Sequence, residues 1–406
     1  MSSWGGLMAS WKTIRLRDVC DSVDYGLTAS ATLQETGTRF LRITDIVSQS
    51  LSWNDVPFVS VTRDQEEKYR VASGDIVIAR TGATTGVSRW LGSVPDSAVF
   101  ASYLVRLKIS SKHDSRFIGY ALKGDQYWDY VRGVLGDKSA QPNASATTLV
   151  AAPLCVPDDI AEQQRIADVL GSLDDKIAIN ERIRDTTLSL AHSCYESTTA
   201  SASSERIGDL ATLFDGPHAT PKKTNSGPWF LSISSLKNGY MDLAESAHLS
   251  EEDFPRWTRR VQPQAGDVLF SYETRLGDAA LMPPGIRGSL GRRMALLRCN
   301  SSSVNGALLL HAYLSSAFQE EIKRRTIHGA TVDRLPLKEM PNWVIQLPAE
   351  GDRNRLSAQL GMMHDRVIQT GKESRALATL RDTLLPQLMS GKLRVRDAEK
   401  IVEDAV

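Results

Sequence analysis

Few side chains in this sequence are spaced for catalysis or metal binding. His192 and Cys194 are the closest pair of potential metal ligands, but two residues apart on a helix they would point about 200° from each other and could not share an ion. Adjacent acids could do acid–base chemistry only if two carboxylates faced each other across a cleft. We interpret these pairs as solvated surface, with Asp158-Asp159 at a helix start, where the dipole favours acids. The pairs are Glu66-Glu67, Asp158-Asp159, Asp174-Asp175, Glu251-Glu252 and Glu320-Glu321.

Sequence motifs of several enzyme classes are missing. There is no GxxxxGK[ST] loop for a triphosphate, no GxGxxG turn for a dinucleotide, no GxSxG elbow and no HExxH. A DNA methyltransferase would need an Asn/Asp-Pro-Pro-aromatic motif for its flipped base, whereas the only adjacent prolines, Pro283-Pro284, lie in a turn-like segment. We therefore expect no catalytic residue, no metal site and no cofactor in this chain.

The composition is that of a folded protein with no global charge. The 406 residues predict two or three domains, and Lys and Arg total 48, as do Asp and Glu, so any charge for binding DNA must be local or supplied by a partner. Four cysteines without CxxC spacing predict packed thiols. No apolar run approaches the roughly 20 residues that cross a bilayer, and the first residues lack a signal-peptide pattern. We expect a cytoplasmic protein without membrane contact.

Segments of the first half of the chain recur in the same order in the second half. FLRITDI at 40–46 matches FLSISSL at 230–236, an offset of 190, and both are typical of short strands. RVASGDIVIARTG matches RVQPQAGDVLFSY, and each has a Gly-Asp turn, Gly74-Asp75 or Gly266-Asp267, before a buried apolar strand. The repeat predicts two similar globules.

A long amphipathic helix follows each globule. Apolar residues at spacings of four, three and four lie on one stripe, which is typical of two helices packed lengthwise. We expect helices from about 159 to 197 and from about 352 to near 385, where Pro386 and Gly391 would interrupt the second. The first would be on the order of 55 Å long and would serve as a spacer. The predicted core of the helix pair is Ile166, Leu170, Leu173, Ile177, Leu356, Leu360, Met363 and Val367.

These elements predict an α+β protein with two similar globular domains separated by two long helices. The predicted segments are 1–158 for the first globular domain, 159–204 for the first helix and its small-residue linker, 205–350 for the second globular domain, and 351–406 for the second helix and the tail.

Four motifs together resemble the specificity subunits of type I restriction-modification systems. LCVPDDIAEQQRIADVLGSLDDKIAINERI at 154–183 is similar to the central conserved region of that family, and LLPQLMSGKLRV at 384–395 is similar to its C-terminal ending. GDIVIARTGATTG and GDVLFSYETRLG resemble the Gly-Asp-Ile-Leu-Phe-Ser-Arg turn of its target-recognition domains. The resemblance spans nearly the whole chain in the right order.

The resemblance implies a non-catalytic subunit for phage defence, in which each target-recognition domain reads one half of a bipartite double-stranded DNA site. The two helices would form an antiparallel coiled coil that spaces the domains and docks two methyltransferase subunits for DNA methylation. Where restriction is present, two motor-endonuclease subunits would join them. S-adenosylmethionine and ATP with Mg²⁺ would belong to these partners, and the complex would act in a prokaryotic cytoplasm.

Two other functions stay open at this point. One is a DNA-recognition subunit of a related defence system without the restriction motor, and the other is a coiled-coil scaffold with two protein-binding domains and no DNA role. An enzyme ranks third, because no catalytic constellation is found.

Polar loops at equivalent places in both halves are the candidates for DNA binding, since base edges are read by Arg, Lys, Asn, Gln, Ser or Thr on loops. For any single candidate, an ordinary solvated loop residue without a role in DNA binding is an equally good interpretation. In the first domain they are Arg80, Thr81, Thr84, Thr85, Lys138, Gln141 and Asn143. In the second domain they are His218, Lys222, Lys223, Tyr272, Glu273, Thr274, Arg275, His328, Thr331 and Arg334.

Exposed polar residues on the first helix are candidates for the methyltransferase interface: Gln163, Gln164, Arg165 and Glu181. The second half departs from the family pattern, because its helix lacks the Glu162-Gln163 pair and Tyr272-Glu273 replaces the Arg-Thr of the first domain's turn. The first departure leaves open how evenly two partners dock, and the second is expected if the domains read different half-sites.

Overall fold

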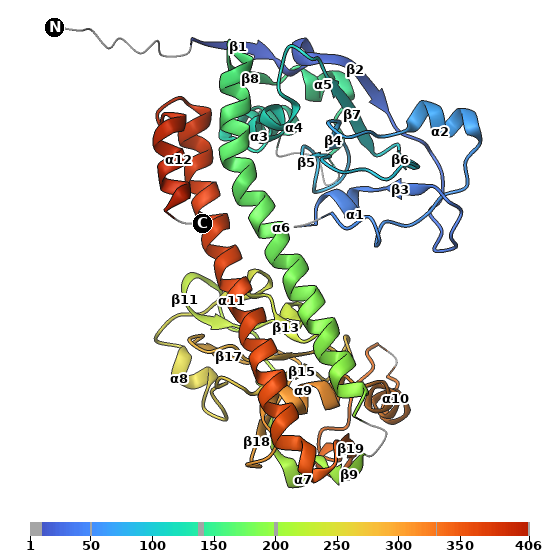
Figure 1. The fold of residues 1–406 in the computed structure, drawn as a ribbon, viewed down its shortest axis with the longest axis vertical. Coiled ribbons are helices and arrows are strands. Elements are labelled where there is room, and N and C mark those ends of the chain that lie inside the picture. The colour runs from blue at the N-terminus through green and yellow to red at the C-terminus, as the bar shows by residue number, and fades with distance from the viewer. Residues whose placement is uncertain (1–9, 49–50, 137–141, 199–201, 330, 405–406) are drawn as a thin grey trace, which may run out of the picture. The chain divides into compact units, whose positions relative to one another are not determined.

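Two units make up the fold, and each combines one sequence repeat with part of both long helices (Figure 1). The computed structural model describes residues 10–48, 51–136, 142–198, 202–329 and 331–404. Unit 1 comprises 1–178 and 375–406, and unit 2 comprises 179–374. Helices α6 (Ile160–Glu196) and α11 (Glu350–Met389) therefore contribute one segment to each unit.

Unit 1 is built on an antiparallel sheet of order β2-β7-β4-β5, with a parallel pair β3-β6 and an antiparallel pair β1-β8. All four residues of β4 are buried, because β4 is an inner strand with both faces covered. The strands are β1 (Trp11–Arg15), β2 (Cys20–Tyr25), β3 (Arg39–Leu41), β4 (Ile76–Ala79), β5 (Ser88–Trp90), β6 (Ala98–Phe100), β7 (Leu104–Ile109) and β8 (Pro153–Pro157). The helices are η1 (Leu16–Val19), α1 (Ile43–Ile46), α2 (Arg63–Tyr69), α3 (Ser115–Ala121), α4 (Asp125–Leu135), α5 (Ala146–Val150) and, after α11, α12 (Val395–Glu403).

Unit 2 repeats this order with a sheet β10-β18-β15-β16, a parallel pair β11-β17 and an antiparallel pair β9-β19. Its strands are β9 (Ser203–Arg206), β10 (Ala211–Asp215), β11 (Thr224–Phe230), β12 (Leu236–Lys237), β13 (Tyr240–Met241), β14 (Ala247–His248), β15 (Val268–Ser271), β16 (Ala279–Leu281), β17 (Gly288–Ser289), β18 (Met294–Cys299) and β19 (Val344–Leu347). Its helices are α7 (Ile207–Leu210), η3 (Ile233–Ser235), η4 (Leu243–Glu245), α8 (Phe254–Trp257), α9 (Gly306–Leu314), α10 (Ser316–Arg325) and η5 (Met340–Asn342).

The matching topologies confirm the predicted repeat and the α+β class, and the Gly-Asp turns show why the repeat is visible in sequence. Gly74 and Gly266 have φ of +89° and +87°, a left-handed conformation that favours glycine. The carboxylates of Asp75 and Asp267 each accept a hydrogen bond from the backbone N–H three residues earlier, at 2.9 and 2.7 Å. Each turn then delivers the chain into an inner strand, β4 or β15.

The predicted strands at 40–46 and 230–236 are wrong over most of their length. Strand β3 ends at Leu41 and is followed by α1, and β11 ends at Phe230 and is followed by η3. A polar side chain starts each turn of helix: Asp45 accepts from the Arg42 N–H at 2.8 Å, and the Ser232 hydroxyl accepts from the Ser234 N–H at 3.3 Å. Local capping outweighs the apolar alternation here.

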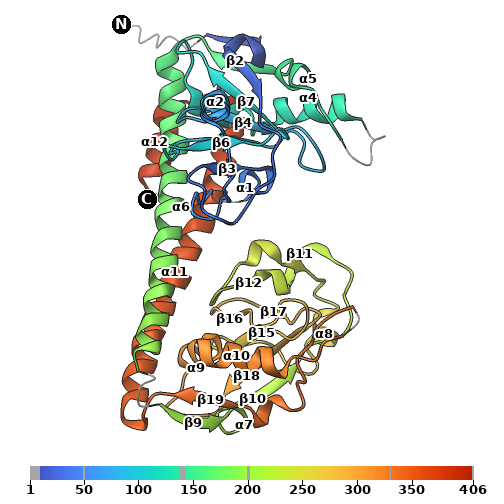
Figure 2. The ribbon, with the colours of Figure 1, turned by 90° about the vertical axis from the view of Figure 1, so that its right-hand side faces the viewer.

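Figures 1 and 2 show α6 and α11 running along both units. The apolar stripe of each helix is buried, but within the core of its own unit. In unit 1, Ile166, Leu170 and Leu173 pack with α3 and with leucines of α11, whereas Leu356 and Leu360 pack in unit 2 with α9 and with Ala191 and Tyr195 of α6. The two stripes therefore lie in different cores, and because each core also contains residues of the other long helix, α6 and α11 pack together within both units. Of the other stripe residues, Val367 is buried, and Ile177 and Met363 are partly buried.

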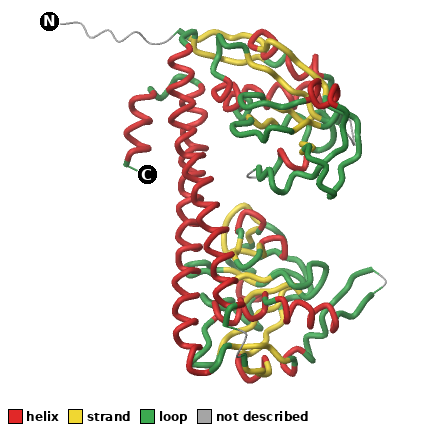
Figure 3. Tube along the Cα trace, turned by 45° about the vertical axis from the view of Figure 1, so that its right-hand side comes forward, coloured by secondary structure: helices red, strands yellow, loops and turns green. Residues whose placement is uncertain are grey.

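The long helices end close to where the sequence places them at three of four ends. Asp159 accepts a hydrogen bond from the Ala161 N–H at 3.0 Å at the start of α6, as expected for an acid at a helix N-terminus. Helix α11, however, continues through Pro386 to Met389. Burial of Leu384, Leu385 and Leu388 in unit 1 offsets the lost backbone hydrogen bond. After Gly391, whose φ is +68°, α12 folds back beside α11 (Figure 3).

Candidate nucleic-acid interface

Two of the predicted loops in unit 1 lie against each other. The Arg80 carbonyl accepts a hydrogen bond from the Ala144 N–H at 2.9 Å, and the Gly82 N–H donates to the Pro142 carbonyl at 2.8 Å. The loop after β4 and the segment before α5 thus form one surface, although about 60 residues separate them. Lys138 and Gln141 lie outside the described residues.

The side chains of this surface differ in what they can still bind. The Arg80 guanidinium donates to Asn143 Oδ1 at 3.3 Å and lies 4.9 Å from the centre of the Tyr25 ring, which holds it over the surface. Asn143 is exposed, and Thr81 and Thr84 are half-buried. Thr85 is 3% exposed, and its hydroxyl donates to the carbonyls of Gly82 and Pro142. The sequence predicts Thr85 as a DNA-binding residue, but in the structure it closes the loop instead.

Unit 2 has the same pair of loops. The Tyr272 carbonyl accepts from the Leu335 N–H at 2.9 Å, the equivalent of the Arg80–Ala144 hydrogen bond, and Glu273 pairs with Arg334 in an isolated bridge. The two loops, which the sequence gives only as separate candidates, form one surface in each unit.

Several candidates in unit 2 are engaged with neighbouring side chains. Tyr272 is 5% exposed, its hydroxyl lies 3.3 Å from His218 Nδ1, and burial, with nearby Asp215, raises the pKa of its phenol. Tyr272 is thus too buried for the base-reading role predicted from sequence, because its ring fills the unit 2 core and links two loops. Glu273 Oε2 is 3.0 Å from Arg293 Nε.

The remaining candidates of unit 2 are exposed. Arg275 pairs with Asp278 at 2.6 Å, and His328 lies 3.2 Å from Asp333. Thr274 has a φ of +70°, which places it at the tip of its turn. The exposed candidates are His218, Lys222, Lys223, Thr274, Arg275, His328, Thr331 and Arg334.

Sequence reasoning missed one turn on each surface. The Tyr272 N–H donates to the Arg293 carbonyl at 3.1 Å, and in unit 1 the Arg80 N–H donates to the Tyr103 carbonyl at 3.0 Å. Arg292 and the 58% exposed Tyr103 therefore belong to these surfaces. The available signal was the repeat itself, because 103 and 293 differ by the same offset of 190 as the matched strands, each just before a buried strand.

Among the predicted partner-interface residues, Gln163 is fully buried. Its amide donates to the Pro157 carbonyl at 2.8 Å and accepts from the Asp114 N–H at 3.0 Å, so it joins α6 to the unit 1 globule. The expectation that Gln163 is exposed is wrong, because the globule covers that face of the helix. Gln164 and Arg165 are exposed, and Glu181 is half-buried.

In the second repeat, Arg353 takes the place of Gln163 and joins α11 to its own globule. Its guanidinium donates to the Pro348 carbonyl at 3.0 Å and also bonds Ser203 and Glu205. The missing Glu-Gln pair of the second helix is therefore a change in how the helix joins its own globule.

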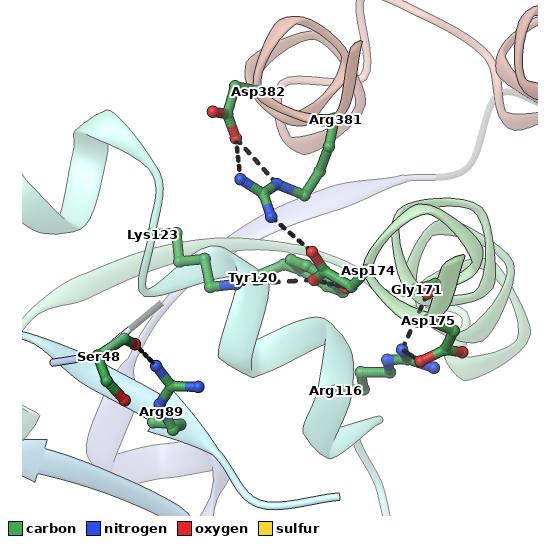
Figure 4. Close-up of polar contacts among 10 residues, drawn as sticks. All are labelled: Ser48, Arg89, Arg116, Tyr120, Lys123, Gly171, Asp174, Asp175, Arg381 and Asp382. Carbon is green, nitrogen blue, oxygen red and sulfur yellow. Dashed lines mark hydrogen bonds and ion pairs between the residues drawn. The ribbon is translucent and has the colours of Figure 1, made fainter. Parts of the chain in front are cut away.

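An ionic cluster joins the globule of unit 1 to the α6 and α11 segments of the same unit (Figure 4). Asp174 of α6 accepts from Arg381 of α11 at 2.6 Å and from the Tyr120 hydroxyl at 2.6 Å, and Lys123 Nζ lies at 3.9 Å. Burial alone would raise the pKa of Asp174, but these three groups hold it below its usual value. Arg116 adds a second contact by donating to Gly171 and Asp175 of α6, at 3.1 and 2.7 Å.

A buried histidine pair occupies the equivalent region of unit 2. Nε2 of His311 in α9 lies 3.0 Å from Nε2 of His364 in α11, and both side chains are 2% exposed. Burial, with the neighbouring imidazoles, lowers the pKa of His311 to about 3, and burial lowers that of His364 to about 4, so both rings are neutral near pH 7.

Within the described ranges, no group of three or more His, Cys, Asp and Glu could hold a metal ion. No described helix combines the length and apolarity of a membrane span.

Comparison with known proteins gives concordant results. A family model for the type I restriction modification DNA specificity domain matches residues 8–187. The putative type I restriction enzyme MjaX specificity subunit of Methanocaldococcus jannaschii is 20% identical, over 97% of this chain and 96% of its own length. The MjaIX specificity subunit of the same organism is 20% identical over 81% and 77%. The crystal structure of the type I S subunit from M. genitalium aligns with a TM-score of 0.55 and 15% identity, covering 95% of this chain and 97% of that one.

Two loop-bearing repeats that share a pair of helices give this chain the fold of the type I S subunit structure. Residues 8–187 match the type I restriction modification DNA specificity domain, and nearly the whole chain is similar to type I specificity subunits.

Proposed function

We propose that each unit reads one half of a bipartite duplex DNA site through its paired loops. The observation that carries the proposal is the equivalence of the Arg80–Ala144 and Tyr272–Leu335 hydrogen bonds, which bring two polar loops together at the same place in both repeats. The scaffold is common to the two units, whereas the exposed side chains on it differ. Different exposed side chains on one scaffold are what reading two different half-sites requires.

In this proposal the helices α6 and α11 space the units and dock two methyltransferase subunits, which hold S-adenosylmethionine and flip the target adenine. Gln164 and Arg165 on the exposed face of α6 are the candidate contacts, with Glu181 further along the helix. Two motor-endonuclease subunits with ATP and Mg²⁺ would complete a restricting complex in a prokaryotic cytoplasm.

Methylome sequencing tests the proposal directly. The chain is expressed with its methyltransferase partner in a host without other adenine methylation, and methylated adenines are mapped genome-wide. One interrupted motif, modified on both strands only when the chain is present, is the expected result. An unchanged methylome with an intact, active methyltransferase would refute the recognition role.

Exchange of the loops then tests which unit reads which half. Replacing the exposed residues at 274–275 and 328–334 of unit 2 should alter one half of the motif and leave the other half and the spacer length unchanged. The matched control is Lys338→Gln, an exposed charge that follows the second loop and precedes η5, which should leave the motif intact. A change in both halves would contradict the assignment of one half to each unit.

A further inference from the structure

Unit 2 contains a surface pocket of about 330 Å³ beside its recognition loops. Two cations, Lys223 and Arg292, line it together with the hydroxyl-bearing residues Thr220, Ser232 and Ser246. None of the described lining residues is acidic. Cations and hydroxyls without an acid are the donor set that binds a phosphate oxygen.

Both cations of the pocket are exposed and have no carboxylate partner among the described residues. This sets them apart from their neighbours, since Arg293 pairs with Glu273 at 3.0 Å and Arg287 pairs with Glu251 at 2.6 Å. Among the described side chains, no carboxylate therefore pairs with the two cations of the pocket. An anion from outside would be drawn to it without displacing an existing ion pair.

The turn that carries Arg292 is fixed in position against the pocket. A Cβ on Gly291 would lie 1.8 Å from the Leu231 carbonyl oxygen, so only glycine allows this close approach, and Leu231 itself lines the pocket. On its other side, the Arg293 carbonyl accepts from the Tyr272 N–H, and the Arg293 side chain donates to the Thr274 hydroxyl at 3.1 Å. The pocket and the recognition loop are thus rigidly joined within unit 2.

We infer that this pocket binds a phosphodiester group of the DNA backbone next to the half-site read by unit 2. The inference rests on the proposed function and assigns Lys223 and Arg292 a different task from base reading. They anchor the duplex and set its register, while the exposed residues of the neighbouring loops contact base edges.

The first repeat does not carry these charges. By the offset of 190, Lys223 and Arg292 correspond to Leu33, which is 93% exposed, and to Ser102. The charges are therefore not needed to build the repeat. At these equivalent positions only unit 2 carries the two cations, so the salt dependence that they contribute should belong to the half-site read by unit 2.

The test is DNA binding by the complex of this chain with its methyltransferase, measured by fluorescence anisotropy over a series of salt concentrations. The probes are the duplex identified by methylome mapping and a scrambled duplex of equal length. For K223Q/R292Q we expect about tenfold weaker binding to both duplexes. The magnitude of the slope of log K against log salt should fall by about one, because about 0.9 counterion is released for each phosphate contact and the pocket holds one phosphate. K223R/R292K should retain the wild-type slope, and Lys338→Gln, a single exposed charge elsewhere in unit 2, should lower neither affinity nor slope as far.

Each other outcome has a definite meaning. An unchanged slope and affinity in K223Q/R292Q overturns the inference while leaving the proposed function standing, because the wild-type complex still binds its motif. Weaker binding only to the specific duplex, at unchanged slope, makes the two residues base readers and also overturns it. Unaltered DNA binding with loss of the methyltransferase from the complex identifies a protein contact instead. Failure of the wild-type complex to prefer its own motif refutes the proposed function itself.

Discussion

Removing Arg381 tests how strongly the ionic cluster of unit 1 holds the helices to the globule. In Arg381→Met the aliphatic stem is kept and the charge is lost, so Asp174 retains only Tyr120 and Lys123. Exposed ion pairs contribute about 0–1 kcal/mol, and removing one partner of a fully buried pair costs about 3–5 kcal/mol. The two side chains are 23% and 28% exposed, so we expect the free energy of unfolding of unit 1 to fall by about 2 kcal/mol.

The assay is native-state hydrogen exchange in increasing urea, read on peptides from α3 in unit 1 and from α9 in unit 2 as an internal reference. Arg375→Met is the matched control, because Arg375 is an exposed arginine of the same helix without an ion-pair partner among the described residues. Its effect should stay within about 0.5 kcal/mol. Equal effects of the two substitutions, or a loss confined to α9, would refute the reasoning.

Three further outcomes are expected. Burial lowers the pKa of His311 to about 3 and that of His364 to about 4, so the unfolded chain binds more protons than the folded chain between pH 4 and 6.5. Acidification from pH 7 to 5 should therefore destabilise unit 2 by up to about 2 kcal/mol for each ring. The urea midpoint of His364→Leu should depend less on pH than that of the wild type, and equal dependence would contradict this. Gly306→Ala should destabilise unit 2 in thermal unfolding, because its Cβ would lie 1.8 Å from the Gly266 carbonyl oxygen. Gly133→Ala, in open space on α4, should stabilise unit 1 by up to about 1 kcal/mol. A change of the same sign for both would be evidence against the close approach of Gly306 to Gly266. Arg80→Ala should relax one half of the methylated motif, at a cost of about 1–3 kcal/mol in discrimination, and an unchanged motif would remove Arg80 from the readers.

The repeat, the α+β class and the long helices could be predicted because each is encoded in local periodicity or in a constant offset between matching residues. The Gly-Asp turns illustrate this, since the left-handed glycine and the carboxylate that closes the turn are adjacent in the sequence. The same local reasoning failed at Pro386, where three buried leucines outweigh a helix-breaking residue.

The site was less predictable, because exposure depends on contacts that are distant in the chain. Gln163 and Thr85 look like ordinary polar surface residues, and both are buried by segments about 50 residues away. Arg292 was missed for the opposite reason, since its turn reaches the candidate surface through contacts of its neighbour Arg293 with Tyr272, Glu273 and Thr274, which are about 20 residues away in the chain. A pattern of residue types cannot show which of two polar segments covers the other.

The completion of unit 1 by residues 375–406 has a consequence for synthesis on the ribosome. Leu377, Leu384 and Leu388 belong to the same buried cluster as Leu170 and Leu173, but more than 200 residues are translated between the two groups. The nascent chain must therefore carry an open apolar face of unit 1 while all of unit 2 is made. A premature stop near codon 375 would leave unit 2 complete but would remove the helical segments that cover the apolar core of unit 1. A truncation late in the gene would therefore destabilise the globule that is translated first.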